Sequence, residues 1–242
     1  MKTDFLFAVF PYVAVGLLAA GIFVRYLLLR KQGAAMSAEI SEARAVFATG
    51  RLWRVSLLLL IAGHLIAVVL PGAILAWNGN RFRLYLLEGI AFAIGVAALG
   101  GWLALMWQNL KRHGGSVLTE LSDTALLALL FVGILSGLLL AVLYRWGSSW
   151  GAMILTPYTA SLLRGKPAAN FILQMPFLVR LHVFSLFAAV AIVPATRLGT
   201  AIVGALQAIL TGLGKPISAG GRASEAWLRK HNPAPWFWPE ED

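Results

Sequence analysis

Five long apolar runs separated by short polar segments dominate the pattern of this 242-residue chain. Each run is close to the roughly 20 residues that a helix needs to cross a bilayer. With 60% hydrophobic and only 12% charged residues, the composition is not that of an ordinary soluble domain. We therefore predict an all-α fold, a polytopic membrane bundle of five transmembrane helices. The runs cover residues 5–29, 54–77, 84–107, 125–143 and 176–193.

The segments between and after these runs suggest further elements. An apolar stretch at 198–213 either extends the fifth helix or lies along the membrane interface. The first loop, 30–52, carries charged residues in a helical pattern, which predicts a short amphipathic helix. The longest connection, 144–174, contains Trp146 and Trp150, residues that suit a cap over the bundle at the level of the lipid headgroups.

The basic residues of the chain report its orientation in the membrane. The formal net charge is +10, but the 20 Lys and Arg residues lie at helix ends and in loops, so we predict lipid rather than nucleic acid as the partner. Most of them fall on one side, which predicts the N-terminus outside and the C-terminus in the cytoplasm. Residues 1–213 would then form the membrane domain and 214–242 a cytoplasmic tail, in a multi-pass protein of a bacterial or archaeal inner membrane.

The absence of cysteine limits the chemistry of the chain. With no thiolate it cannot hold an iron–sulfur cluster, a covalent c-type haem or thiolate-bound zinc, nor form a disulfide. We also find no Ser-His-Asp set, paired acid–base carboxylates, phosphate-binding loop or zinc spacing. We therefore expect no complete active site of the usual hydrolytic or phosphoryl-transfer kinds, and the polar residues within the apolar runs are the candidate functional groups.

Two histidines, His64 and His182, lie inside the second and fifth apolar runs. An imidazole in hydrocarbon is costly and therefore usually functional. Chain direction places both in the outer half of the membrane, and neutral imidazole is a standard axial ligand of haem iron. We predict that the pair binds one non-covalent haem b from both faces. The alternative roles for these histidines are interhelical hydrogen bonding and a proton path.

Glycines and arginines near these histidines suit the same cofactor. Gly63, Gly89 and Gly95 would leave room for a porphyrin beside the helix backbones, and glycines of the fourth run offer the same relief. The alternative is that they allow close helix packing. Three arginines near the outer helix ends are candidates for binding haem propionates, or instead for reaching lipid phosphates. They are Arg81, Arg83 and Arg180.

A set of short motifs extends over nearly the whole chain: Phe-Pro-Tyr at 10–12, Arg-Tyr at 25–26, Gly-His at 63–64 followed by Pro71, Tyr-Thr-Ala-Ser-Leu at 158–162, Phe-Leu-Val-Arg-Leu-His at 177–182 and Pro-Ala-Thr-Arg-Leu at 194–198. This arrangement resembles the γ (cytochrome b) subunit of respiratory nitrate reductase. The resemblance implies a five-helix quinol-oxidising subunit with non-covalent haem b. His64 and His182 match the ligands of the haem nearer the outer face, which adjoins the quinol site in that family.

The chain departs from the family at the second pair of ligands. The residues that hold the inner haem in the family would fall at Arg54 and Thr200, and neither side chain ligates iron in the usual way. We therefore expect the inner haem to be absent. A single outer haem would have to bridge most of a hydrocarbon core about 30 Å thick to reach a cytoplasmic partner.

We accordingly predict an electron-transfer subunit that exchanges electrons between quinol or quinone and a partner redox protein at the outer face, such as a c-type cytochrome. A partner membrane subunit that supplies the inner carrier is the other possibility. Arg81, Arg83 or Arg180 could hold the quinol oxygen, and Glu88 could accept its proton or pair with an arginine. Two other functions stay open: a haem-free scaffold or transporter, and an ordinary γ subunit that reduces a cytoplasmic iron–sulfur subunit.

Overall fold

The structure is a computed structural model that describes residues 2–29, 33–48, 50–112 and 121–209. Within these residues the chain is helical and contains no strand. The elements are α1 (Lys2–Ala8), α2 (Phe10–Leu29), α3 (Gly33–Phe47), α4 (Arg51–Val69), α5 (Pro71–Asn78), α6 (Arg81–Arg112), α7 (Leu121–Leu143), α8 (Gly147–Leu163), α9 (Asn170–Leu173), α10 (Phe177–Ile192) and the short 3-10 turn η1 (Val193–Ala195). A further helix covers Arg197–Ile209.

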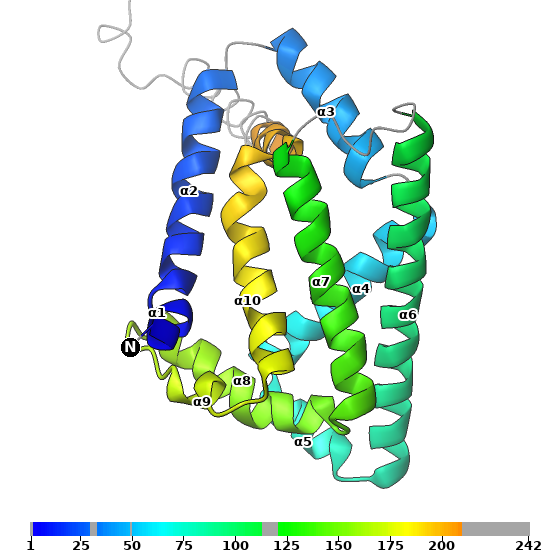
Figure 1. Cartoon of the computed structure of the whole chain (residues 1–242), viewed down its shortest axis with the longest axis vertical. Helices are drawn as coiled ribbons and strands as arrows, with labels where there is room; N and C mark the ends of the chain where they lie inside the picture. The colour runs from blue at the N-terminus through cyan, green and yellow to red at the C-terminus, as the bar shows by residue number, and fades with distance from the viewer. Residues whose placement is uncertain (1, 30–32, 49, 113–120, 210–242) are drawn as a thin grey trace, which may run out of the picture.

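Five of the described helices are long and apolar enough to cross a membrane, namely α2, α4, α6, α7 and α10. The prediction of an all-α bundle with five membrane-spanning helices is therefore confirmed. α10 packs between α2 and α7, α7 also contacts α6, and α4 packs on α6 and α8. Figure 1 shows α8 and α9 lying across one end of the bundle and α3 across the other. We call these the α8 end and the α3 end.

The second predicted span is broken into two helices. The apolar run covers 54–77, and Pro71 marks the outer end of the second membrane helix: α4 ends at Val69 and α5 begins at Pro71. Proline disfavours helical conformation in the residue before it, and Leu70 accordingly adopts φ −124° and ψ 52°. The break lets α5 turn aside and pack against α8 at the α8 end.

The connecting segments also form helices. The amphipathic helix expected in the first loop is confirmed as α3. The connection 144–174 forms α8 and α9, which cap the bundle as predicted (Figure 1). Of the two alternatives for 198–213, extension of the fifth helix is wrong, because η1 separates α10 from the helix over Arg197–Ile209. The predicted tail, 214–242, lies outside the described residues.

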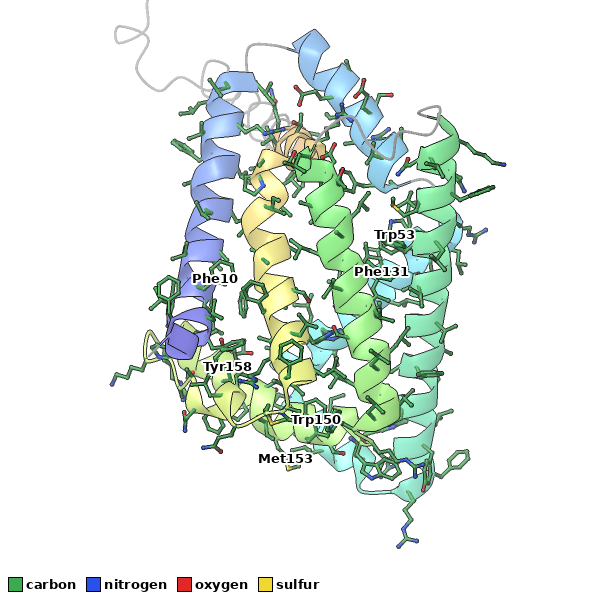
Figure 2. The ribbon with its side chains drawn as sticks, in the orientation of Figure 1. Phe10, Trp53, Phe131, Trp150, Met153 and Tyr158 are labelled. Atoms are coloured by element: carbon green, nitrogen blue, oxygen red, sulfur yellow. The ribbon has the colours of Figure 1, made fainter. Side chains whose placement is uncertain are left out.

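Two clusters of buried side chains hold the bundle together. The cluster at the α3 end joins α3, α4, α6, α7 and α10 around Trp53 and Leu105. The cluster at the α8 end joins α1, α7, α8, α9 and α10 around Tyr158 and Ile172. Figure 2 shows Trp53 in the first cluster and Tyr158 with Trp150 in the second. The remaining helix surface is largely apolar and exposed, as in Leu58 and Phe23, which suits contact with lipid.

The contact between α4 and α6 gives a first prediction. A Cβ atom added at Gly101 would lie 2.7 Å from the Cα of Trp53, whereas one at Gly100 meets no atom within 4 Å. Gly101→Ala should therefore force the two helices apart and cost about 1–3 kcal/mol of stability. Gly100→Ala should be neutral or stabilising by up to about 1 kcal/mol. Thermal unfolding of both variants in detergent measures the difference, and equal melting temperatures would contradict the packing.

Candidate functional site

The structure brings the two membrane histidines together. His64 comes from α4 and His182 from α10, and the centroids of their rings lie 6.0 Å apart with an angle of 30° between the ring planes. The rings approach although α4 packs chiefly on α6 and α8, while α10 packs on α7 and α2. Two residues far apart in the chain therefore face each other, with the His182 ring partly buried and the His64 ring exposed on α4.

Hydrogen bonds fix the orientation of both rings. The Nδ1 of His64 lies 2.7 Å from the carbonyl oxygen of Leu60. The Nδ1 of His182 lies 2.9 Å from the carbonyl oxygen of Gly133 and 3.1 Å from the Oγ of Ser136. A carbonyl only accepts hydrogen bonds, so we infer that each Nδ1 carries the proton. In a neutral imidazole this leaves Nε2 with a free lone pair, which is the form that binds metals.

The separation of the rings suits a single metal atom. Imidazole nitrogens bind a metal at about 2.0–2.1 Å, so two rings that share one metal atom have centroids roughly 6 Å apart. The observed 6.0 Å agrees. Among the residues that the structure describes, no group of three or more His, Cys, Asp or Glu side chains could hold a metal ion. A metal held by this pair would therefore take its other ligands from outside the protein, as from the four nitrogens of a porphyrin.

Two glycines of α7 allow His182 to lie where it does. A Cβ atom at Gly137 would be 3.0 Å from the Cε1 of His182, and one at Gly133 would be 3.3 Å from the Oγ of Ser185. Gly133 also supplies the carbonyl oxygen that orients the imidazole. Gly133 and Gly137 thus lie closer to the histidine pair than Gly63, Gly89 and Gly95, the three glycines that the sequence analysis singled out.

Those three glycines have different surroundings. A Cβ atom at Gly63 or Gly89 would meet no atom within 4 Å, so both lie beside open space. At Gly95 a Cβ atom would be 2.8 Å from Leu138 of α7, which identifies Gly95 as a contact between helices. Of the three, only Gly63 adjoins a histidine of the pair in the sequence.

The three arginines are not brought to the histidines by any hydrogen bond in the described residues. Arg81 is exposed at the start of α6. Arg83 of α6 places its guanidinium 5.4 Å from the ring centroid of Trp77 on α5. Arg180 is half-buried on α10, and its Nε is buried without a hydrogen-bond partner. Residues two apart do not share a helix face, so the backbone directs Arg180 away from His182.

Glu88 is bound to the start of α8. Its Oε1 accepts hydrogen bonds from the backbone N–H of Ser148 at 2.8 Å and from the Oγ of the same residue at 2.6 Å. A carboxylate at a helix N-terminus satisfies free N–H groups and interacts favourably with the helix dipole. Sequence reasoning missed this contact because the carboxylate comes from α6, 60 residues earlier, and local capping patterns carry no trace of it.

This fold and site define a polytopic helical membrane protein with a pair of opposed, membrane-embedded imidazoles. Comparison with known proteins gives the family. The sequence model of the nitrate reductase gamma subunit matches residues 3–211, and the chain therefore belongs to the nitrate reductase gamma subunit family.

Two curated relatives match over most of their length. The nitrate reductase gamma chain of Bacillus subtilis (strain 168) is 23% identical over 201 residues, which cover 82% of this chain and 90% of the relative. The respiratory nitrate reductase 2 gamma chain of Escherichia coli (strain K12) is 23% identical over 202 residues, 80% of this chain and 87% of the relative. Both relatives are bacterial, so the archaeal part of the predicted location gains no support.

The contact of Glu88 gives a second prediction. Glu88→Gln and Ser148→Ala each remove part of the same charge-assisted interaction and should each lower stability by about 1–3 kcal/mol. The double variant should lose little more than the worse single variant, because the two residues act as one unit. Thermal unfolding of the three variants in detergent tests this coupling. Fully additive losses would mean that Glu88 stabilises the fold by some other contact.

Proposed function

We propose that this chain is a membrane cytochrome b subunit that exchanges electrons between quinol or quinone and a partner redox protein. The cofactor is one non-covalent haem b with His64 and His182 as axial ligands. The observation that supports this most strongly is the ring pair itself, with both Nδ1 atoms engaged and a centroid distance of 6.0 Å that suits one shared metal atom. Family membership and the lack of cysteine support the same conclusion.

The residues of the chain have defined tasks in this proposal. A bound haem supplies one-electron redox chemistry at its iron. His64 and His182 would hold and orient the group, and the carbonyl oxygen of Gly133 keeps the His182 ring in place. Gly137 leaves room for that ring. α5 and α8 pack together across the α8 end.

Three arginines and Glu88 are the candidates for contact with the haem propionates or with quinol. Among the three arginine candidates, Arg180 has a buried Nε without a partner, but it lies on the face of α10 that is turned away from His182. Arg81 and Arg83 are exposed in the first turn of α6 at the α8 end and suit a more peripheral contact. Glu88 is a candidate proton acceptor through its Oε2, since its Oε1 already accepts two hydrogen bonds from Ser148.

The residues at the α3 end support the proposal that the chain binds only one haem, the one at His64 and His182. At the two positions that correspond to the inner ligands, Arg54 is exposed and Thr200 is fully buried in hydrogen bonds with Arg25 and Glu39. The core cluster around Trp53 fills the space between the helices at this end of the bundle. Electrons would then enter and leave near the α8 end. With the N-terminus outside, as the charge distribution predicts, the partner redox protein docks at the outer face.

Haem content tests the ligand assignment. We expect pyridine-haemochrome analysis of the purified chain to give about one haem b per chain, lost in His64→Ala and in His182→Ala. His113→Ala is the matched control, since His113 lies in a polar segment of the sequence, and it should keep its haem. No haem in well-folded wild-type protein would favour a scaffold or transporter. Two haems would favour an ordinary γ subunit that passes electrons inward.

The side of electron exchange gives a further prediction. In right-side-out vesicles the membrane-impermeant oxidant ferricyanide should oxidise the reduced haem rapidly, because the proposed site lies near the outer face. In inverted vesicles the same oxidant should react slowly, because the hydrocarbon core, about 30 Å thick, separates it from the haem. Stopped-flow absorbance of the haem bands gives both rates. Faster oxidation in the inverted vesicles would place the partner on the cytoplasmic side.

A further inference from the structure

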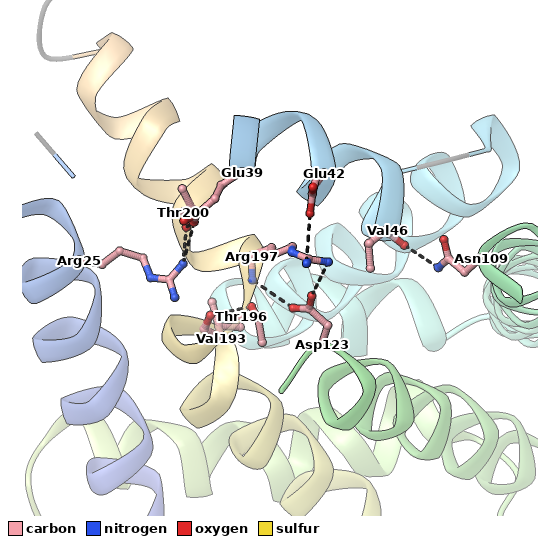
Figure 3. A network of polar contacts seen from close by, with 10 residues as sticks. All are labelled: Arg25, Glu39, Glu42, Val46, Asn109, Asp123, Val193, Thr196, Arg197 and Thr200. Atoms are coloured by element: carbon pink, nitrogen blue, oxygen red, sulfur yellow. Dashed lines mark hydrogen bonds and ion pairs between the residues drawn. The ribbon is translucent and has the colours of Figure 1, made fainter. Parts of the chain in front are cut away.

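A network of charged side chains binds α3 to the end of the bundle (Figure 3). On one side, Arg25 of α2 lies 3.6 Å from the Oε2 of Glu39 on α3. The guanidinium of Arg25 also donates to the Oγ1 of Thr200, which in turn donates to Glu39. Thr200 belongs to the helix over Arg197–Ile209 and is fully buried. Three separate helices therefore meet at these side chains.

Arg197 makes the second part of the network. Its guanidinium lies 3.1 Å from the Oε2 of Glu42 on α3 and 3.5 Å from the Oδ2 of Asp123 on α7. Its backbone N–H donates to the Oδ1 of Asp123 at 3.0 Å. Asp123 is fully buried, so this arginine compensates a carboxylate that has no access to water. The contacts connect α3 with α7 through the helix over Arg197–Ile209.

The C-terminal turn of α3 is attached by two buried donors. The Nδ2 of Asn109 on α6 donates to the carbonyl oxygen of Val46 at 3.1 Å. The Nε1 of Trp53 on α4 donates to the carbonyl oxygen of Phe47 at 2.8 Å. These bonds satisfy carbonyl groups that a helix end otherwise leaves without an intrahelical partner. α3 is thus fixed from Glu39 to Phe47, by ion pairs near its middle and by hydrogen bonds at its C-terminal end.

The space beneath α3 does not suit a second haem. Val46 and Phe47 of α3 pack directly onto the core cluster around Trp53. The cavity at the network has a volume of about 290 Å³ and is lined by Arg25, Ala38, Glu39, Glu42 and Arg197. A lining of four charged side chains suits water rather than the apolar face of a porphyrin. Both the packed core and the charged cavity exclude a large flat apolar group.

We infer that α3 is a seal that closes this end of the bundle and stands in the place of the second haem implied by the family resemblance. Arg25, Arg197 and their carboxylate partners hold the seal, and Thr200 is one of its buried parts rather than a vacant ligand position. The inference rests on the contacts of α3 and is independent of whether haem binds at His64 and His182.

Cysteine accessibility tests the seal directly, because the natural chain contains no cysteine. Ala43→Cys and Val46→Cys place a thiol at positions of α3 that are each 2% exposed, and Ser41→Cys places one at an exposed position of the same helix. In the detergent-solubilised full chain, a hydrophilic maleimide should label the two buried thiols roughly tenfold or more slowly than the exposed one, since labelling requires local opening. Equal rates for all three would overturn the inference.

Breaking the ion pairs should open the seal. In the Ala43→Cys protein, adding Glu39→Gln and Glu42→Gln should raise the labelling rate several-fold. The same two changes in the Ser41→Cys protein serve as the control for the effect of charge on thiol reactivity, and they should raise its rate less than that of the Ala43→Cys protein. An Ala43→Cys rate that does not respond would show that the ion pairs do not hold α3.

Restoring histidines at the inner ligand positions gives the complementary test. Arg54→His with Thr200→His should leave the pyridine-haemochrome content of the full chain at the wild-type value, because the core beneath α3 leaves no room. A gain of one haem per chain would overturn the seal. If this variant does not fold, the labelling rates of the cysteine variants still test whether α3 closes this end of the bundle. Absence of haem from the wild type would refute the proposed function and leave the labelling result intact.

Discussion

The position of the His182 ring depends on how closely α10 can approach α7. The backbone carbonyl of Gly133 holds the Nδ1 of the imidazole, and the missing side chain of Gly137 leaves space for the ring. A polar group in an apolar interior is costly unless it is paired, so this contact fixes both where the ring lies and which nitrogen carries the proton. His64 repeats the arrangement within α4 through Leu60. The opposed pair follows from these two local bonds.

Polar side chains inside the bundle are paired in different ways at its two ends. Near the α8 end, two imidazole rings face each other, each with its Nδ1 held by a backbone carbonyl. At the α3 end, Arg197 and Asp123 pair with each other, and removal of one partner from such a buried pair typically costs about 3–5 kcal/mol. The relatives are gamma chains of nitrate reductases, whereas this chain has Arg54 and Thr200 at the inner ligand positions that the family resemblance implies. This asymmetry limits the proposed electron route to one face.

Much of this architecture could be predicted from the sequence. Length and apolarity define the five spans, and chain direction alone places His64 and His182 at a similar depth. The break at Pro71 follows from the chemistry of proline, but the direction in which α5 then turns depends on its packing against α8. The contacts Glu88–Ser148 and Arg25–Thr200 join residues 60 and 175 positions apart, and no local pattern signals them. The orientation in the membrane and the boundary of the tail stay predictions.

The central claim is that one iron atom is held between His64 and His182. Electron paramagnetic resonance of the oxidised, purified full chain tests it most directly, because the spectrum of ferric haem depends on its axial ligands. We expect a single low-spin ferric species of the kind given by two imidazole ligands, converted to a high-spin species or lost in His64→Ala and His182→Ala. A high-spin spectrum in the wild type, or a low-spin signal that survives both substitutions, would contradict the claim.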